Sequence, residues 1–438
     1  MLTLSLHPLW LRLTFLLALT VALIALSSFL VGAAIGDSYV VFAQRATDLS
    51  TVVRLEGADK AVRHAARDPL VHYRRGLIYL NAAPEDETES RLTTAVTEMR
   101  EAVKLSPEDN RLWIALGQAL DHSGAAVEAQ AAFEQARQLA PHHFQPQWAL
   151  GNHWLRVGDR EAAFAQFRAV LAVRPTELPQ VFGYAWQAYN GDASEIVKAL
   201  SPPPSARAEL ASLLISRDRV DEALKVWREV EKPLATDVKM VTRALINKEH
   251  FTAAHEVWRT SALNELPSPD EGSLLANGGF DKEISLNAAQ PFLTWQMKPQ
   301  PGVTMARDSQ EHKSGAYSLR VSFDLSGNPV VVIATQTVPI APATTYRLSF
   351  AAQTEELRNL SPPLVEVYDA ARRERLHVES KPIMTEKKEW HDYSIEFTTT
   401  ASTEAVTIQL ERLACSDPPC PLRGRIWFDD FKLEKRSK

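Results

Sequence analysis

The spacing of three prolines, Pro107, Pro141 and Pro175, constrains the fold of this chain more than any other feature, because each lies 34 residues from the next. An interval of roughly 20 to 50 residues indicates stacked repeats, since one such unit cannot bury its apolar face alone. Other residues recur at the same offset, namely the pairs Leu116/Leu150, Gly117/Gly151, Gly124/Gly158, Ala129/Ala163 and Phe133/Phe167. The sequence therefore predicts an array of similar units.

Each unit is predicted to form two helices joined by a turn. Trp113, Leu116 and Leu120 share one helical face. Gly124 marks the turn, and Pro141 ends the second helix because proline lacks a backbone N–H and restricts the residue before it. The pattern resembles the tetratricopeptide repeat. This resemblance implies an α-solenoid with a concave face that binds a protein partner.

Weaker copies of the unit flank the two central ones. Tyr73, Gly76 and Tyr79 suggest an earlier helix, and a polar insertion follows at residues 84–90. Downstream, an alanine precedes an aromatic residue by four positions in the pairs Ala223/Trp227 and Ala254/Trp258. We predict about five helical hairpins over residues 59–264.

An uncharged apolar run from Leu13 to Ile35 precedes the repeats. Its 23 residues would form ~34 Å of helix, enough to cross a hydrocarbon core of ~30 Å. The run predicts a membrane anchor over residues 1–36 and a juxtamembrane linker over residues 37–58. A cleaved signal peptide is the alternative, although the apolar part of such peptides is usually shorter.

After residue 264 the hydrophobic pattern changes from the helical period to a period of two. A linker is predicted at residues 265–272, and an antiparallel β-sandwich at residues 273–438, because many short alternating segments separated by turns are typical of that fold. The alternating segments are residues 317–323, 346–350, 364–368, 393–397 and 406–410.

Several motifs in this region occur in a characteristic order, beginning with Asn277-Gly-Gly-Phe-Asp281 and Trp295 and ending with Arg425-Ile-Trp-Phe-Asp-Asp-Phe431. The order resembles the jelly-roll carbohydrate-binding modules attached to xylanases and cellulases, within the wider galactose-binding-like group. The resemblance implies glycan binding and a structural calcium held by Asp281 and Asp430, with Asp429 as an alternate ligand. Calcium takes about six to eight oxygen ligands. A capped turn with a solvent-facing aspartate is the alternative.

Sugar recognition pairs an aromatic ring with planar polar side chains. Alternation places Glu366 and Tyr368 on the face opposite Val365 and Val367. If the valines are core, Glu366 and Tyr368 point outward together, which makes them the preferred ligand pair. The full set of candidates on or near the predicted strands is Tyr317, Gln336, Arg347, Glu366, Tyr368, Trp390 and Gln409. Packing within the fold is the alternative for the tryptophan.

The two cysteines of the chain, Cys415 and Cys420, lie in one loop before the last predicted strand. A zinc site would need a second pair of ligands nearby, and a redox motif would have the spacing Cys-x-x-Cys. We therefore predict a structural disulfide. Disulfides persist in oxidising compartments, so the sequence predicts a single-pass protein of the bacterial inner membrane, with its bulk in the periplasm.

The net charge of −6 disfavours nucleic-acid binding. The sequence contains no Walker loop, Gly-x-Ser-x-Gly or His-Glu-x-x-His motif, so we do not expect an enzyme. The expected function is a membrane-anchored scaffold whose solenoid binds a protein and whose jelly roll binds a glycan. Fold-level analogy adds a role in cell-surface polysaccharide synthesis or export. The alternative is a purely protein–protein scaffold, in which the sandwich is structural or binds a partner.

Overall fold

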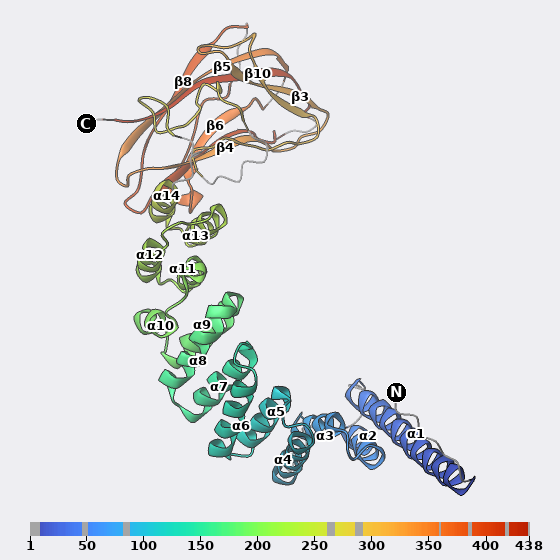
Figure 1. Ribbon diagram of the computed structural model, residues 1–438. Coiled ribbons are helices and arrows are strands. Elements are labelled where there is room, and N and C mark those ends of the chain that lie inside the picture. The colour runs from blue at the N-terminus through green and yellow to red at the C-terminus, as the bar shows by residue number, and fades with distance from the viewer. Residues whose placement is uncertain are drawn as a thin grey trace, which may run out of the picture. The chain divides into compact units, whose positions relative to one another are not determined.

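The structure is a computed structural model that describes residues 9–45, 51–81, 88–260, 268–284, 292–358, 361–383, 388–416 and 420–436. The chain divides into two compact units, Met1–Ala206 and Arg207–Lys438. The described part of the first unit is helical, and the second joins further helices to a β-sandwich (Figure 1).

The first unit is a succession of helices in which α3 pairs with α4, α5 with α6, and α7 with α8. Short 3₁₀ turns, Pro175–Glu177 and Pro204–Ala206, lie at its later end. The helices are α1 (Leu9–Arg45), α2 (Thr51–His64), α3 (Pro69–Asn81), α4 (Thr88–Leu105), α5 (Asn110–His122), α6 (Ala126–Leu139), α7 (Phe144–Val157), α8 (Arg160–Val173), α9 (Leu178–Ala188) and α10 (Ala193–Leu200). The predicted insertion falls mostly on residues 82–87, which lie outside the described residues.

The two central hairpins are built in the same way. An ideal Cβ on Gly117 would lie 2.6 Å from the Phe133 ring, and one on Gly151 would lie 2.6 Å from the Phe167 ring. In both hairpins the glycine that follows the first helix has a positive φ, 82° in one and 91° in the next, which glycine adopts without strain. Packing and turn thus recur at the 34-residue offset, which confirms the tetratricopeptide-type repeat.

The prediction of a membrane anchor is wrong. The apolar run from Leu13 to Ile35 belongs to the longer helix α1, which continues past it to Arg45. Beyond the run, α1 packs against α2, so closely that an ideal Cβ on Gly36 would lie 3.1 Å from the Ala61 carbonyl oxygen. Within the part of the chain that the structure describes, no helix combines the length and the apolar character needed to cross a membrane. This finding also overturns the predicted single-pass inner-membrane location.

The second unit begins with two further pairs of helices, α11 (Arg207–Ser216) with α12 (Val220–Arg228), and α13 (Ala235–Asn247) with α14 (Phe251–Thr260). The alanine and aromatic pairs found in the sequence lie in α12 and α14. All four side chains of these pairs are buried, which fits their expected role in packing.

Within the described residues, the β-sandwich consists of two five-stranded antiparallel sheets with the orders β1-β4-β9-β6-β7 and β2-β3-β10-β5-β8. Most consecutive strands alternate between the two sheets, which is the topology of a jelly roll and confirms that prediction. Figure 1 shows the two layers. The strands are β1 (Gln296–Met297), β2 (Val303–Asp308), β3 (Ser318–Leu325), β4 (Val331–Pro339), β5 (Thr345–Arg358), β6 (Leu364–Asp369), β7 (His377–Glu379), β8 (His391–Thr398), β9 (Ala405–Arg412) and β10 (Leu422–Lys435).

Candidate functional site

Polar side chains gather on the outer face of the sheet that contains β6. Alternation turns the valines of β6 into the core, where both are fully buried, and leaves Glu366 and Tyr368 on the opposite face. In the register of the sheet, Glu366 is paired with Gln409 of β9 on one side and with Glu379 of β7 on the other. One row of polar side chains therefore runs across three strands.

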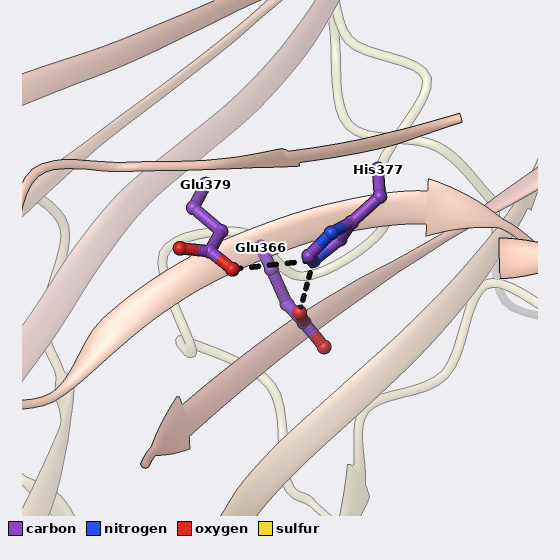
Figure 2. Close-up of side chains that lie close together, drawn as sticks. All are labelled: Glu366, His377 and Glu379. Atoms are coloured by element: carbon purple, nitrogen blue, oxygen red, sulfur yellow. Dashed lines mark hydrogen bonds and ion pairs between the residues drawn. The ribbon is translucent and has the colours of Figure 1, made fainter. Parts of the chain in front are cut away.

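Glu366 is covered, not exposed as the sequence predicts. Its Oε1 accepts a hydrogen bond of 2.7 Å from Gln409, and its Oε2 lies 2.8 Å from Nε2 of His377. The guanidinium of Arg373, from a 3₁₀ turn between β6 and β7, also donates to Oε2. We refer to Glu366, Arg373, His377, Glu379, Gln409 and Glu411 as the Glu366 cluster, of which Figure 2 shows three members.

Glu411 makes the cluster electrostatically unusual. Gln409 donates a 2.7 Å hydrogen bond to its Oε2, while its buried Oε1 has no hydrogen-bond partner. Burial, followed by the charge of Glu366, raises the pKa of the Glu411 carboxyl. Two buried carboxylates thus share one amide and compete for Arg373, whose guanidinium lies 3.9 Å from the orphan oxygen.

Tyr368 supplies the aromatic surface of this face. Its ring is half-buried, and its hydroxyl donates a 3.2 Å hydrogen bond to Oε1 of Gln409. The guanidinium of Arg373 lies 4.9 Å from the ring centroid. On the same row, the hydroxyls of Thr407 and Thr337 lie 3.2 Å apart. Ring, guanidinium, amide and hydroxyl groups therefore stand side by side.

The other predicted ligand residues lie elsewhere. Gln336 faces the core, where its amide exchanges two 3.0 Å hydrogen bonds with the backbone of Ala276. Arg347 lies on β5 in the other sheet, and Trp390 immediately precedes β8. Tyr317 precedes β3, with the guanidinium of Arg307 3.8 Å from its ring centroid. Of the predicted ligand residues, the structure brings together only Glu366, Tyr368 and Gln409.

The three aspartates predicted to bind calcium hold a loop. Asp281 accepts hydrogen bonds from two backbone N–H groups of residues 313–317, at 2.6 and 3.1 Å, and Asp429 accepts two more, at 2.7 and 3.2 Å. Asp430 accepts a 2.5 Å hydrogen bond from the hydroxyl of Ser314. Each of the three carboxylates thus has a structural role in the loop, and the calcium role stays a prediction.

Asp281 and Asp430 also line a polar pocket of about 650 Å³ that includes Arg347. Burial raises the pKa of the neighbouring Asp429 to about 6. The structure thus places Asp281 and Asp430, predicted to bind calcium, in the same pocket as Arg347, predicted to bind a glycan.

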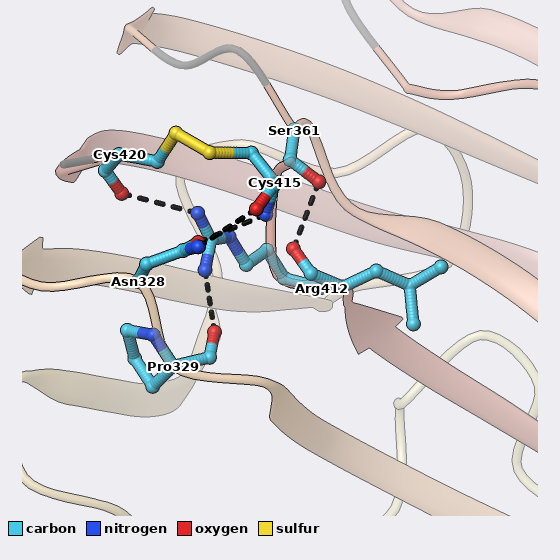
Figure 3. Close-up of a disulfide and its surroundings, with 7 residues drawn as sticks. Asn328, Pro329, Ser361, Arg412, Cys415 and Cys420 are labelled. Carbon is cyan, nitrogen blue, oxygen red and sulfur yellow. Dashed lines mark hydrogen bonds between the residues drawn. A yellow bond between two sulfur atoms is a disulfide. The ribbon is translucent and has the colours of Figure 1, made fainter. Parts of the chain in front are cut away.

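Cys415 and Cys420 form a disulfide (Figure 3). The side-chain amide of Asn328 makes hydrogen bonds of 2.9 Å to the backbone N–H and carbonyl of Cys415. Arg412, fully buried, donates to the carbonyl oxygens of Cys420 at 3.1 Å and Pro329 at 2.5 Å. The disulfide loop is therefore attached to the start of β4.

A second pocket, of about 730 Å³, lies among the first helices of the repeats. Tyr73 of α3, Ile114 of α5 and Trp148 of α7 line it, together with polar residues such as Gln118. A mixed apolar and polar groove of this kind suits an extended or helical peptide.

Sequence reasoning missed Arg373, His377, Glu379 and Glu411. Glu411 could have been predicted, because it continues the period-two series of Thr407 and Gln409 along β9. The other three come from a turn and a three-residue strand, which are too short to show a period.

Comparison with known proteins finds one family model and several solved structures that resemble parts of the chain. Residues 272–416 match the family described as a carbohydrate binding domain. A xylan-binding domain, CBM22-1, from Paenibacillus barcinonensis is 10% identical and covers 40% of this chain and 99% of its own, with a TM-score of 0.26. A thermophilic tetratricopeptide repeat protein of Thermus thermophilus is 15% identical and covers 49% of this chain and 99% of its own, with a TM-score of 0.27.

Among curated proteins, Superkiller protein 3 of Schizosaccharomyces pombe is 30% identical over 107 residues, which are 24% of this chain and 7% of that relative. The chain thus spans a small fraction of this relative. The chain thus joins tetratricopeptide-type repeats, defined by the geometry described above, to a domain that matches the carbohydrate-binding family. This is the architecture of a binding or scaffold protein. None of these similarities supports the expected role in polysaccharide synthesis or export.

Proposed function

We propose that this protein is a non-enzymatic scaffold whose sandwich binds a glycan on the outer face of β4, β9, β6 and β7. The observation that carries the proposal is the half-buried ring of Tyr368 beside the partly exposed guanidinium of Arg373, in a domain that matches a carbohydrate-binding family. An aromatic edge or face packs against the apolar side of a pyranose, and planar polar groups hydrogen-bond its hydroxyls.

Affinity electrophoresis of the full chain tests the proposal, with native gels that contain soluble xylan, β-glucan or glucomannan. Removal of the ring in Tyr368→Ala is expected to weaken retardation about tenfold, or roughly 1.4 kcal/mol. Tyr317→Ala is the matched control, since its ring lies next to β3 in the other sheet. Equal retardation of the two variants, or uniform mobility of the folded protein in every gel, contradicts glycan binding at this face.

The groove lined by Tyr73, Ile114 and Trp148 supports a second candidate function, the binding of a protein partner by the repeats. Ile114→Glu places a charge in the groove and should abolish capture of the partner from cells that produce the protein. Val127→Glu, at an exposed position on α6, is the control. Partner capture by the repeats in a protein that binds none of the glycans favours the purely protein–protein scaffold.

A further inference from the structure

Strand β7 places two metal-ligating side chains on one face. His377 and Glu379 alternate with Val378, so both point to the side on which Glu366 of β6 lies. One nitrogen or oxygen atom from each of the three residues lies within 4.8 Å of the other two (Figure 2). Convergence of an imidazole with two carboxylates is a common donor set for transition metals.

Two of the three spacings between the donor atoms are close to those of a tetrahedral site. Nε2 of His377 lies 2.8 Å from Oε2 of Glu366 and 3.4 Å from Oε1 of Glu379. Two ligand atoms that are each ~2.1 Å from a tetrahedral zinc ion are about 3.4 Å apart. One of the two spacings therefore already has the required value, and the other needs a small outward movement of Glu366.

The charge around these residues points independently to a cation. Glu366 and Glu411 are buried, and Oε1 of Glu411 has no hydrogen-bond partner. Glu366 and Glu411 both lie beside the guanidinium of Arg373, whose side chain is 46% exposed, while Glu379 lies 3.4 Å from Nε2 of His377. Burial of carboxylates is unfavourable unless positive charge balances them. A divalent cation would add positive charge to what the partly exposed Arg373 and His377 provide.

We propose that Glu366, His377 and Glu379 bind a divalent cation of the zinc type in place of the Arg373 guanidinium. An imidazole ligand favours zinc over calcium, which takes oxygen ligands. Three protein ligands leave a fourth position open to water or to a hydroxyl group. The proposal stands apart from glycan binding, although Glu366 belongs to both surfaces.

Calorimetric titration with zinc chloride tests the site, on the full chain without a polyhistidine tag and after treatment with a chelator. We expect one site that His377→Ala weakens about 100-fold. His391→Ala is the matched control, because it removes an exposed histidine at the start of β8 in the other sheet. Absence of binding to the wild-type chain, or equal binding by the His377→Ala variant, overturns the proposal.

Arg373→Ala separates a metal site from a purely structural cluster. Loss of the guanidinium frees Glu366, so zinc affinity should rise about tenfold, whereas weaker or unchanged binding contradicts the proposed competition. Glu379→Gln provides a ligand variant with little risk to folding, since that side chain is 41% exposed, and it must also weaken zinc binding. Zinc should raise the melting temperature of the wild type but not of His377→Ala. No polysaccharide is present in these titrations, so their outcome is independent of the electrophoresis.

Discussion

At the scale of single residues, two glycines set how closely the helices of each central repeat approach. Gly117 packs against the buried ring of Phe133, which cannot move aside in a filled core. Gly117→Ala is therefore expected to destabilise the protein by roughly 1–3 kcal/mol in urea denaturation. Gly183→Ala in α9 is the control: its new Cβ meets nothing within 4 Å, so the variant should gain about 0.5–1 kcal/mol. Equal effects at both positions would refute this explanation.

Asp429 makes stability depend on pH. Burial raises the pKa of its carboxyl from 3.8 to about 6, so the folded chain keeps a proton that the unfolded chain has released. The contribution of this group to the free energy of unfolding therefore falls as pH rises from about 4 to about 6, and is constant above that range. Asp429→Asn should abolish this decrease of the free energy of unfolding between about pH 4 and pH 6. Denaturation profiles of the two proteins in chelator, taken at several pH values, measure the difference, and parallel profiles count against it.

At the scale of elements, the disulfide loop should contribute modestly to stability. Closing a ring between Cys415 and Cys420, five positions apart in sequence, stabilises a protein by roughly 2 kcal/mol through the unfolded chain. Replacing both cysteines by serine is expected to cost no more than that, because Asn328 and Arg412 still hold the loop. Chemical denaturation with and without reductant provides the measurement. Reductant should lower the free energy of unfolding of the wild type and leave that of the double variant unchanged.

The alternating pattern is enough to predict the strands. It does not always predict which face of a strand a side chain occupies. Gln336 illustrates the limit: a register shift between Val332 and Ala334 changes which residues of β4 face the core, and it carries the glutamine inward. Glu366 was placed on the correct face. The Glu366 carboxylate is buried by Arg373 and His377. The positions of these two residues depend on a turn whose sequence shows no hydrophobic period.

The apolar run of α1 shows a similar limit. Hydropathy reports the composition of a segment and not what lies against it. The described large apolar side chains of the run are exposed, and the close contact with α2, at Gly36, lies just beyond the run. By contrast, the 34-residue interval encodes both the helices and their packing, because the same glycine and phenylalanine recur in each unit. The packing within the repeats was therefore predictable from the sequence, whereas the contact between α1 and α2 was not.

At the scale of the whole second unit, the last helices and the sandwich are joined by polar contacts. Glu404, before β9, accepts a 2.7 Å hydrogen bond from the N–H of Thr252 at the start of α14. Glu249 lies 3.2 Å from Arg372 and 3.3 Å from Arg375. Those two arginines flank Arg373, which covers Glu366. The turn that closes the candidate site is thus fastened to the final helical pair.

His255 should make this attachment sensitive to acid. Its ring contacts Phe292 of the sandwich at 5.7 Å between centroids, and burial, with Arg259, lowers the pKa of the imidazole below 6.5. The opened state therefore binds a proton more readily than the docked state, so docking weakens as pH falls from about 6.5. His255→Leu keeps the apolar contact and removes the proton site. It should abolish the acid-dependent part of α14 opening.

Hydrogen exchange of the α14 amides at pH 7 and pH 5.5, corrected for intrinsic rates, measures this opening. The wild type should lose protection at the lower pH, and His255→Leu should not. His391→Leu, which alters an exposed histidine on β8, should behave as the wild type does. Because the carboxylates of Glu249 and Glu404 also join the last helices to the sandwich, a loss of protection shared by all three proteins would assign the acid response to these carboxylate contacts and not to His255.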